Sequence, residues 1–100
     1  MPKDLLGQEI ESGSYISYAT TRERAPLMKI GRVMRYAGTP GGAWTIYVKG
    51  VDKDEWMPLP TPNANISKLT HLDRIVVIPA SSIPESWKDV INGVPDAKSA

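Results

Sequence analysis

Turn-forming residues divide this chain into short runs in which apolar and polar side chains alternate. The sequence has nine prolines and eight glycines, and many of them fall between the alternating runs, as in residues 12–14 and 38–42. A helix of ordinary length needs about ten or more residues without such breaks, whereas a strand needs only about four to eight. The spacing of the turns therefore favours a mainly β fold over a helix bundle.

Three runs, residues 15–18, 27–37 and 44–49, are predicted to be strands because apolar side chains recur at every second position. Residues 74–78 are also predicted to be a strand, because they contain an uninterrupted apolar, β-branched run that is typical of a strand covered on both faces. A further short strand is expected near residues 8–10. Residues 20–26 and 61–69 are polar or end in proline, so we expect exposed loops there. Gly31 interrupts the alternation of the second run, which is typical of a bend or a bulge.

The C-terminal part predicts one short helix over about residues 83–92. Ser82 and Glu85 have the spacing of a capping box, Pro84 is tolerated in the first helical turn, and Gly93 predicts the end of the helix. Apolar side chains recur on one face of this helix: Ile83, Trp87, Val90, Ile91 and Val94. Residues 95–100 are expected to fray.

These elements predict a single domain over residues 1–100. We expect a five-stranded small barrel over about residues 8–79, with the C-terminal helix as a cap and Trp87 plugging one end. Gly31 would be the point at which the second strand curls to close the barrel.

Three stretches resemble SH3-like small barrels of the KOW type. In IESGSYISY (residues 10–18) a glycine turn precedes an alternating strand, and LMKIGRVMRY (residues 27–36) carries a Gly-x-Val pattern at Gly31 and Val33. DRIVVIP (residues 73–79) would supply a later strand. The resemblance implies an SH3-like fold and, as one expectation, nucleic-acid binding. The opening DLLGQEIESGSYISYAT (residues 4–20) is similar to short accessory proteins of tailed bacteriophages, which implies a phage protein that acts on the host or on phage nucleic acid.

The composition argues against most catalytic chemistries. The chain has no cysteine, which excludes disulfides, thiolate catalysis and cysteine-based metal sites, and its one histidine, His71, has no serine or acid at the spacing of a catalytic triad motif. The acids of residues 52–55 lack the spacing of a calcium loop, and residues 38–42 lack the lysine of a phosphate-binding loop. We therefore expect no enzymatic activity, no cofactor and no metal.

No apolar stretch approaches the roughly 20 residues that cross a bilayer, and the N-terminus lacks the apolar centre of a secretory signal. We therefore expect no membrane partner and a cytoplasmic protein, located in the host cytoplasm if the chain is of phage origin.

Positive charge is concentrated in one third of the chain. Residues 20–50 contain six Lys and Arg residues and a single acid, Glu23, although the net charge of the whole chain is only +1. Tyrosines lie close to these cations in the sequence. The candidate contact residues are Arg22, Arg24, Lys29, Arg32, Arg35, Tyr36, Tyr47 and Lys49.

This basic and aromatic set has several interpretations. Arg and Tyr are enriched at the centres of protein interfaces, so the first is a binding module that recognises a host or phage protein. The same residues can neutralise phosphates and stack on bases, so DNA or RNA is the alternative partner. A virion or assembly component is a third possibility. It also stays open that these side chains only keep strand edges and the exposed face soluble.

Overall fold

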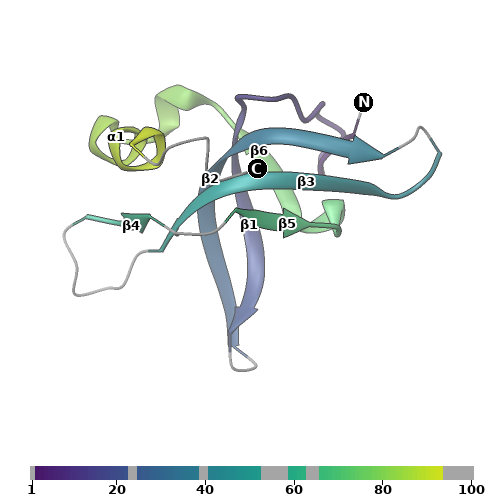
Figure 1. Ribbon diagram of the computed structural model, residues 1–100, viewed down its shortest axis with the longest axis horizontal. Helices are drawn as coiled ribbons and strands as arrows, with labels where there is room; N and C mark the ends of the chain where they lie inside the picture. Colours follow the sequence, from purple (N-terminus) through teal and green to yellow (C-terminus); the bar gives the residue numbers. More distant parts are fainter. Residues whose placement is uncertain (1, 23–24, 39–40, 53–58, 63–65, 94–100) are drawn as a thin grey trace.

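The computed structural model describes residues 2–22, 25–38, 41–52, 59–62 and 66–93 of the protein (Figure 1). Its elements are, in chain order, β1 (Tyr15–Arg22), β2 (Ala25–Gly38), β3 (Trp44–Asp52), β4 (Thr61–Pro62), β5 (Ser67–Leu69), the 3-10 helix η1 (Leu72–Arg74), β6 (Ile75–Ile78), the 3-10 helix η2 (Ala80–Ser82) and α1 (Glu85–Asn92). Within these residues no helix has the length and apolar character needed to span a membrane.

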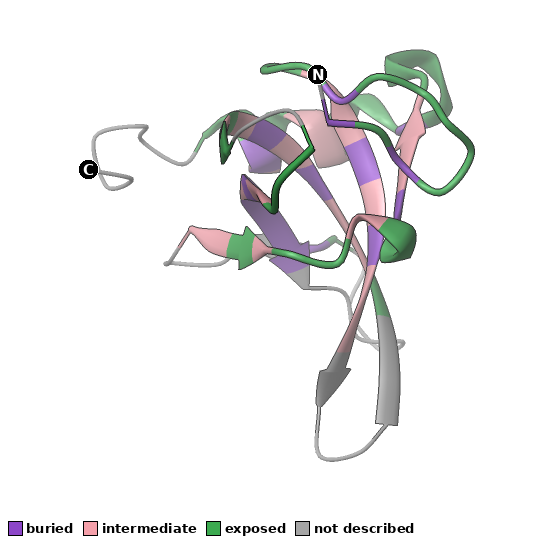
Figure 2. Ribbon diagram, turned by 90° about the vertical axis from the view of Figure 1, so that its right-hand side faces the viewer, coloured by how far each residue is buried: buried purple, intermediate pink, exposed green. Residues whose placement is uncertain are grey.

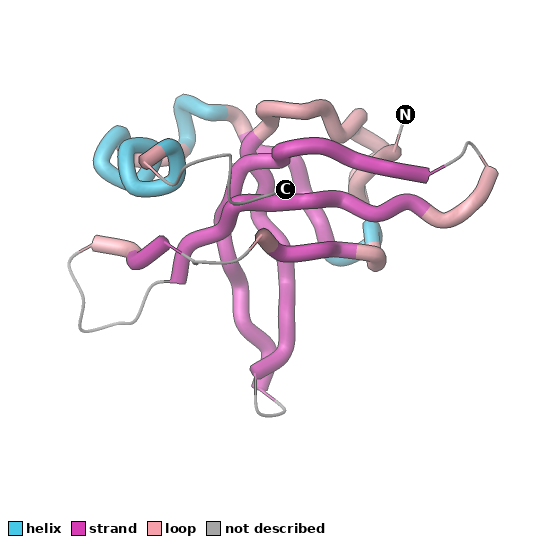
Figure 3. Tube along the Cα trace, in the orientation of Figure 1, coloured by secondary structure: helices cyan, strands magenta, loops and turns pink. Residues whose placement is uncertain are grey.

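All strands belong to one antiparallel sheet. The strand order is β4-β3-β2-β1-β6, and β5 pairs with β3 as well. The long strand β2 pairs with β1 from Ala25 to Arg32 and with β3 from Ile30 to Gly38, so it links the two parts of the sheet. The outer part of the β1–β2 hairpin projects away from the other strands (Figure 3).

The prediction of a mainly β fold with a short C-terminal helix is confirmed, but the prediction of a closed barrel is wrong. In the described residues no pairing joins β6 to β4 or β5. The outer edge of β6 is instead occupied by the N-terminal segment, where the Leu5 amide donates to the Ile75 carbonyl (2.9 Å) and the Val77 amide donates to the Asp4 carboxylate (2.7 Å). Because these backbone groups already have partners, that edge is not available for closing the sheet.

One face of the sheet, here called the inner face, carries the hydrophobic core. Its side chains come from alternate positions of the strands, as expected for period-two patterns, and Figure 2 shows the buried positions along them. The core cluster consists of Ile10, Ile16, Tyr18, Val33, Ile46, Val48 and Ile75, with Tyr36, Leu69, Leu72 and Val77 packed against it.

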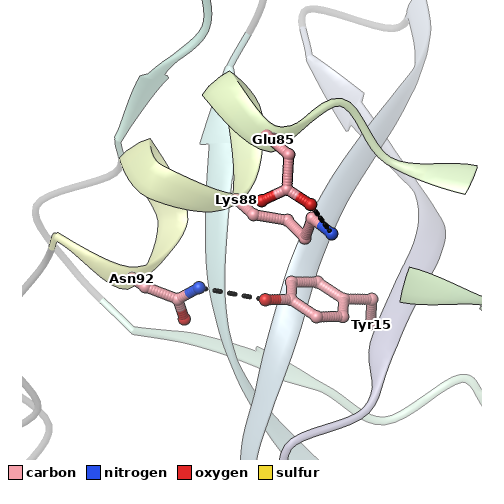
Figure 4. A network of polar contacts seen from close by, with 4 residues as sticks. All are labelled: Tyr15, Glu85, Lys88 and Asn92. Atoms are coloured by element: carbon pink, nitrogen blue, oxygen red, sulfur yellow. Dashed lines mark hydrogen bonds and ion pairs between the residues drawn. The ribbon is translucent and has the colours of Figure 1, made fainter. Parts of the chain in front are cut away.

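The helix α1 lies on the opposite, outer face of the sheet, where it contacts β3 and β4. Tyr15, which alternates with the inner residue Ile16, accepts a hydrogen bond from Asn92 Nδ2 (3.0 Å; Figure 4). Ile91 and Val51 are buried but do not belong to the inner core cluster. The helix therefore covers the outer face of an open sheet instead of plugging a barrel, and its buried residue is Ile91, whereas Trp87 is half-buried.

The structure has more strands than the sequence predicts, and β1, β2 and β3 are longer than predicted. Residues 20–26, predicted to be a loop, continue β1 to Arg22 and begin β2 at Ala25. Pro26 is tolerated opposite Thr21 because β3 pairs with β2 only from Ile30 onward, so among the described strands this part of β2 pairs with β1 alone. The predicted loop at residues 61–69 contains β4 and β5, whereas residues 8–10 form only an isolated bridge between Glu9 and Lys3.

Two local predictions about helix capping and strand curvature are also corrected. Pro84, not Ser82, is the N-cap of α1, and it makes no side-chain capping bond; Ser82 ends η2. The register of β2 against β3 shifts between Val33 and Arg35, so the bulge falls at Met34 and not at Gly31. A side chain at Gly31 would collide with the Lys49 carbonyl oxygen and lie 2.6 Å from Val48 Cγ1, so this glycine permits the close approach of β2 and β3.

Candidate functional site

The predicted contact residues do not all lie on one surface. Tyr36 points to the inner face, where it packs on the core and meets Trp44 edge-to-face at a centroid distance of 5.7 Å. Lys49 is only 3% exposed, and Lys29 is half-buried opposite the buried Tyr18. Arg22 ends β1, with a side chain outside the described part of the structure, and Arg24 lies outside the described residues altogether.

Three side chains do form a continuous row on the outer face, which we call the Tyr47 row: Arg35, Tyr47 and Lys68. Arg35 of β2 lies directly opposite Tyr47 of β3, which in turn lies directly opposite Lys68 of β5. Directly opposed residues of antiparallel strands project from the same face, so the pairing itself brings the three side chains together. Lys68 was not among the predicted residues.

The Tyr47 ring lies between two cations. Arg35 Cζ is 3.8 Å from the ring centroid and Lys68 Nζ is 6.0 Å from it, both within the range of a cation–π interaction. Each contact of this kind contributes about 0.5–1 kcal/mol at an exposed site. The contact of Arg35 with the ring restricts the guanidinium without using the N–H donors that bind carboxylates and phosphates.

Both cations of the row are available to an external anion. Arg35 and Lys68 are exposed, and in the part of the chain that the structure describes neither forms an ion pair with a carboxylate. Tyr47 is half-buried between them. The row is thus a positively charged surface with an aromatic centre, held in place by the pairing of three strands.

The bulge at Met34 decides which side chains belong to this surface. With regular alternation from the inner residue Val33, Arg35 would point to the inner face and Tyr36 to the outer face. The extra residue at Met34 shifts the phase by one position, so that Arg35 lies opposite Tyr47 and Tyr36 lies opposite the buried Ile46. The same shift explains why Tyr36, a predicted contact residue, packs on the core instead.

The remaining predicted cations of the outer face lie farther along the sheet. Arg32 is half-buried between Tyr15 of β1 and Lys49 of β3, and its Nη2 lies 4.0 Å from Met34 Sδ. Arg32 and Lys49 both interact within the protein, so neither is a free charge. Arg35 and Lys68 are therefore the more accessible cations of this face.

A second polar site, at Asp4, was not predicted. Asp4 is only 7% exposed, and its carboxylate accepts hydrogen bonds from the backbone amides of Leu6 (2.9 Å), Gln8 (2.8 Å) and Val77 (2.7 Å) and from Gln8 Nε2 (2.9 Å). Burial acts to raise the pKa of Asp4, but the hydrogen bonds donated by Val77, Gln8 and Leu6 outweigh it, so the pKa lies below its ordinary value of 3.8. The charged carboxylate of Asp4 thus links the N-terminal turn to β6 through its hydrogen bonds.

Among the described residues no group of three or more His, Asp or Glu side chains is placed to hold a metal ion, and His71 is an exposed residue before η1. Comparisons of the chain with family models, with curated proteins and with solved structures found no match.

Proposed function

We propose that this protein is a non-enzymatic binding module that recognises another protein through the Tyr47 row. The observation that carries the proposal is the presence of two exposed cations on either side of one tyrosine ring, neither of which forms an ion pair with a carboxylate of the described residues. Arg and Tyr are the residue types most often found at energetic centres of protein interfaces. Because the row is built on paired strands, its backbone is already ordered before a partner binds, which lowers the entropic cost of binding.

The burial of three predicted contact residues, Lys29, Arg32 and Lys49, favours a protein partner over a nucleic acid. Nucleic-acid affinity rises with the number of phosphates that a protein neutralises, and Lys49 is buried while Lys29 and Arg32 are half-buried. In addition, Arg35 already lies over the Tyr47 ring, so a base could stack on that face only by displacing the guanidinium.

Nucleic-acid binding is nevertheless the second candidate, because of the β1–β2 hairpin. The hairpin projects from the sheet, β1 ends at Arg22, and Arg24 follows in the sequence (Figure 1). This candidate predicts that labelled single- and double-stranded DNA and RNA bind at low salt, with an affinity that falls steeply as salt is added and is lost in an Arg22→Glu/Arg24→Glu variant. Absence of binding at low salt would eliminate it.

The proposal also includes an SH3-like relationship and a phage-type setting. Two features support an SH3-like arrangement in which the sheet is not closed. The strand β2 is shared between two parts of the sheet, and the 3-10 helix η1 lies between β5 and β6. The resemblance of the N-terminal stretch to phage accessory proteins supports a role in the host cytoplasm on a host or phage protein. A virion or assembly component remains the alternative, and it predicts co-purification with virions.

Affinity capture with charge-reversed variants tests the proposed function. The tagged wild-type protein, an Arg35→Glu/Lys68→Glu variant and a Lys3→Glu/Arg74→Glu variant are incubated with nuclease-treated host lysate. The control changes the net charge equally, at exposed positions outside the Tyr47 row. We expect the wild type and the control to retain the same protein and the Arg35/Lys68 variant to lose it. Retention of the partner by the wild type and by both variants, with equal melting temperatures, would contradict the proposal.

A further inference from the structure

From the structure we infer that the Tyr47 row takes one particular kind of partner: an extended segment with alternating acidic and apolar residues, which pairs with the outer edge of β5. The inference rests on the proposed function, and it specifies the chemistry and the geometry of the partner. Three observations carry it: the charge of the row, the state of the sheet edges, and the direction of neighbouring side chains in β5.

The charge of the row calls for an anionic partner. Arg35 and Lys68 are exposed and, in the part of the chain that is described, lack carboxylate partners. An acidic side chain placed opposite Lys68 on an added strand would lie next to Lys68, on the same face as Tyr47 and Arg35. A carboxylate suits both kinds of cation, because it can accept two parallel hydrogen bonds from a guanidinium and can form an ion pair with an ammonium.

The sheet edges differ in their accessibility. The outer edge of β6 is covered by the N-terminal segment, through Leu5 and through the carboxylate of Asp4. In contrast, β5 pairs with β3 alone among the described strands, and its residue Lys68 belongs to the Tyr47 row. A lysine on an edge strand repels a second copy of the same edge, but it attracts a strand that carries acids.

The alternation within β5 sets the pattern of the added strand. Lys68 points to the outer face, whereas Ser67 and Leu69 lie opposite the inner residues Val48 and Ile46, and Leu69 packs on the core. A residue opposite Lys68 is therefore expected to be Asp or Glu, and its two neighbours, which point toward the inner face, are expected to be apolar.

The experiment uses the full chain and a short blocked synthetic peptide of alternating valine and glutamate. Three further probes serve as controls: the same peptide with N-methylated backbone amides, a peptide with lysine in place of glutamate, and an oligothymidine whose charge equals that of the glutamate peptide. Binding is followed by the amide signals of the ¹⁵N-labelled protein. We expect the first peptide to shift the signals of Ser67–Leu69 and Tyr47, and Lys68→Glu to weaken its binding by about five-fold or more, with Lys3→Glu unchanged.

The other probes separate this inference from the proposed function. Equal binding of the N-methylated peptide, or shifts away from β5, would overturn strand addition. Failure of the peptide to bind, while a lysate protein is still captured through Arg35 and Lys68, would overturn the inference and leave the proposed function standing. Binding of the oligothymidine in place of the peptide would overturn both.

Discussion

Asp4 and Val77 are joined by a hydrogen bond of 2.7 Å from the Val77 amide to Asp4 Oδ2, although they lie 73 residues apart in the chain. The Asp4 carboxylate acts as the carbonyl of a neighbouring strand would, because it accepts the hydrogen bond of a backbone amide on the outer edge of β6. Gln8 Nε2 donates to the Val77 carbonyl (3.2 Å), and the Leu5 amide donates to the Ile75 carbonyl (2.9 Å). Side chains and backbone of the N-terminal turn thus close an edge of the sheet that would otherwise be open.

Removal of the Asp4 carboxylate is expected to destabilise the protein. Asp4→Ala removes the acceptor of the Leu6, Gln8 and Val77 amides, and we expect the free energy of unfolding to fall by about 2 kcal/mol or more, since bonds to a charged group are among the stronger ones. Urea unfolding at neutral pH measures the change. Glu11→Ala, at an exposed carboxylate, is the control and should change the stability by less than about 0.5 kcal/mol.

The same carboxylate predicts a dependence of stability on pH. Because the pKa of Asp4 is lower in the folded protein than its ordinary value of 3.8, the folded state binds this proton less tightly than the unfolded state does. The stabilisation is therefore fully present above that value and is lost as the pH falls through the lower, folded pKa. We expect the stability difference between wild type and Asp4→Asn to be constant well above pH 3.8 and to shrink as the pH falls below 3.8. A difference that does not change with pH would show that Asp4 does not act as a charged acceptor.

Gly31 is expected to be intolerant of any side chain. A methyl group there would collide with the Lys49 carbonyl and lie 2.6 Å from Val48 Cγ1, so we expect Gly31→Ala to reduce the free energy of unfolding by about 2 kcal/mol and Gly31→Val by more. Gly13 is the matched control, because it has a φ of 90° but open space around it, and Gly13→Ala should cost only about 1 kcal/mol. Urea unfolding compares the variants. Equal costs at the two positions would argue against close strand approach as the reason for Gly31.

The packing of α1 on the sheet gives another prediction. A helix of eight residues is not stable in isolation, so its burial against the sheet must hold it. Ile91 is 1% exposed, and we expect Ile91→Ala to cost about 3 kcal/mol. Tyr15→Phe removes only the exposed hydrogen bond from Asn92 and should cost less than about 1 kcal/mol. If Ile91→Ala leaves the unfolding midpoint unchanged, the helix is free to bind a partner instead.

The elements with long alternating patterns could be predicted from the sequence. The runs that became β2 and β3 carry enough alternating positions to define a strand, and the C-terminal helix was predicted to within a few residues. β5 has only three residues, too few for a periodic pattern, so Lys68 was not recognised as a strand residue beside Tyr47.

The features that could not be predicted from the sequence depend on contacts between distant parts of the chain. A single bulge at Met34 turns Arg35 outward and Tyr36 inward, and no turn residue in the sequence marks its position. The role of Asp4 depends on Val77, a partner near the other end of the chain. Lys49 follows the alternation of an exposed face, yet it is buried on the face that α1 covers. Each of these features depends on pairing or packing between distant segments.

The central claim is that the Tyr47 row is the binding surface of this protein. The most direct test is a titration of the ¹⁵N-labelled full chain with the purified protein that the wild type captures, followed by mapping of the perturbed amide signals. We expect the perturbations to centre on Arg35, Tyr47 and Lys68, and to be absent from Asp4–Gln8 and from α1. Perturbations centred on the N-terminal turn or on the helix, with the signals of the row unchanged, would contradict the claim.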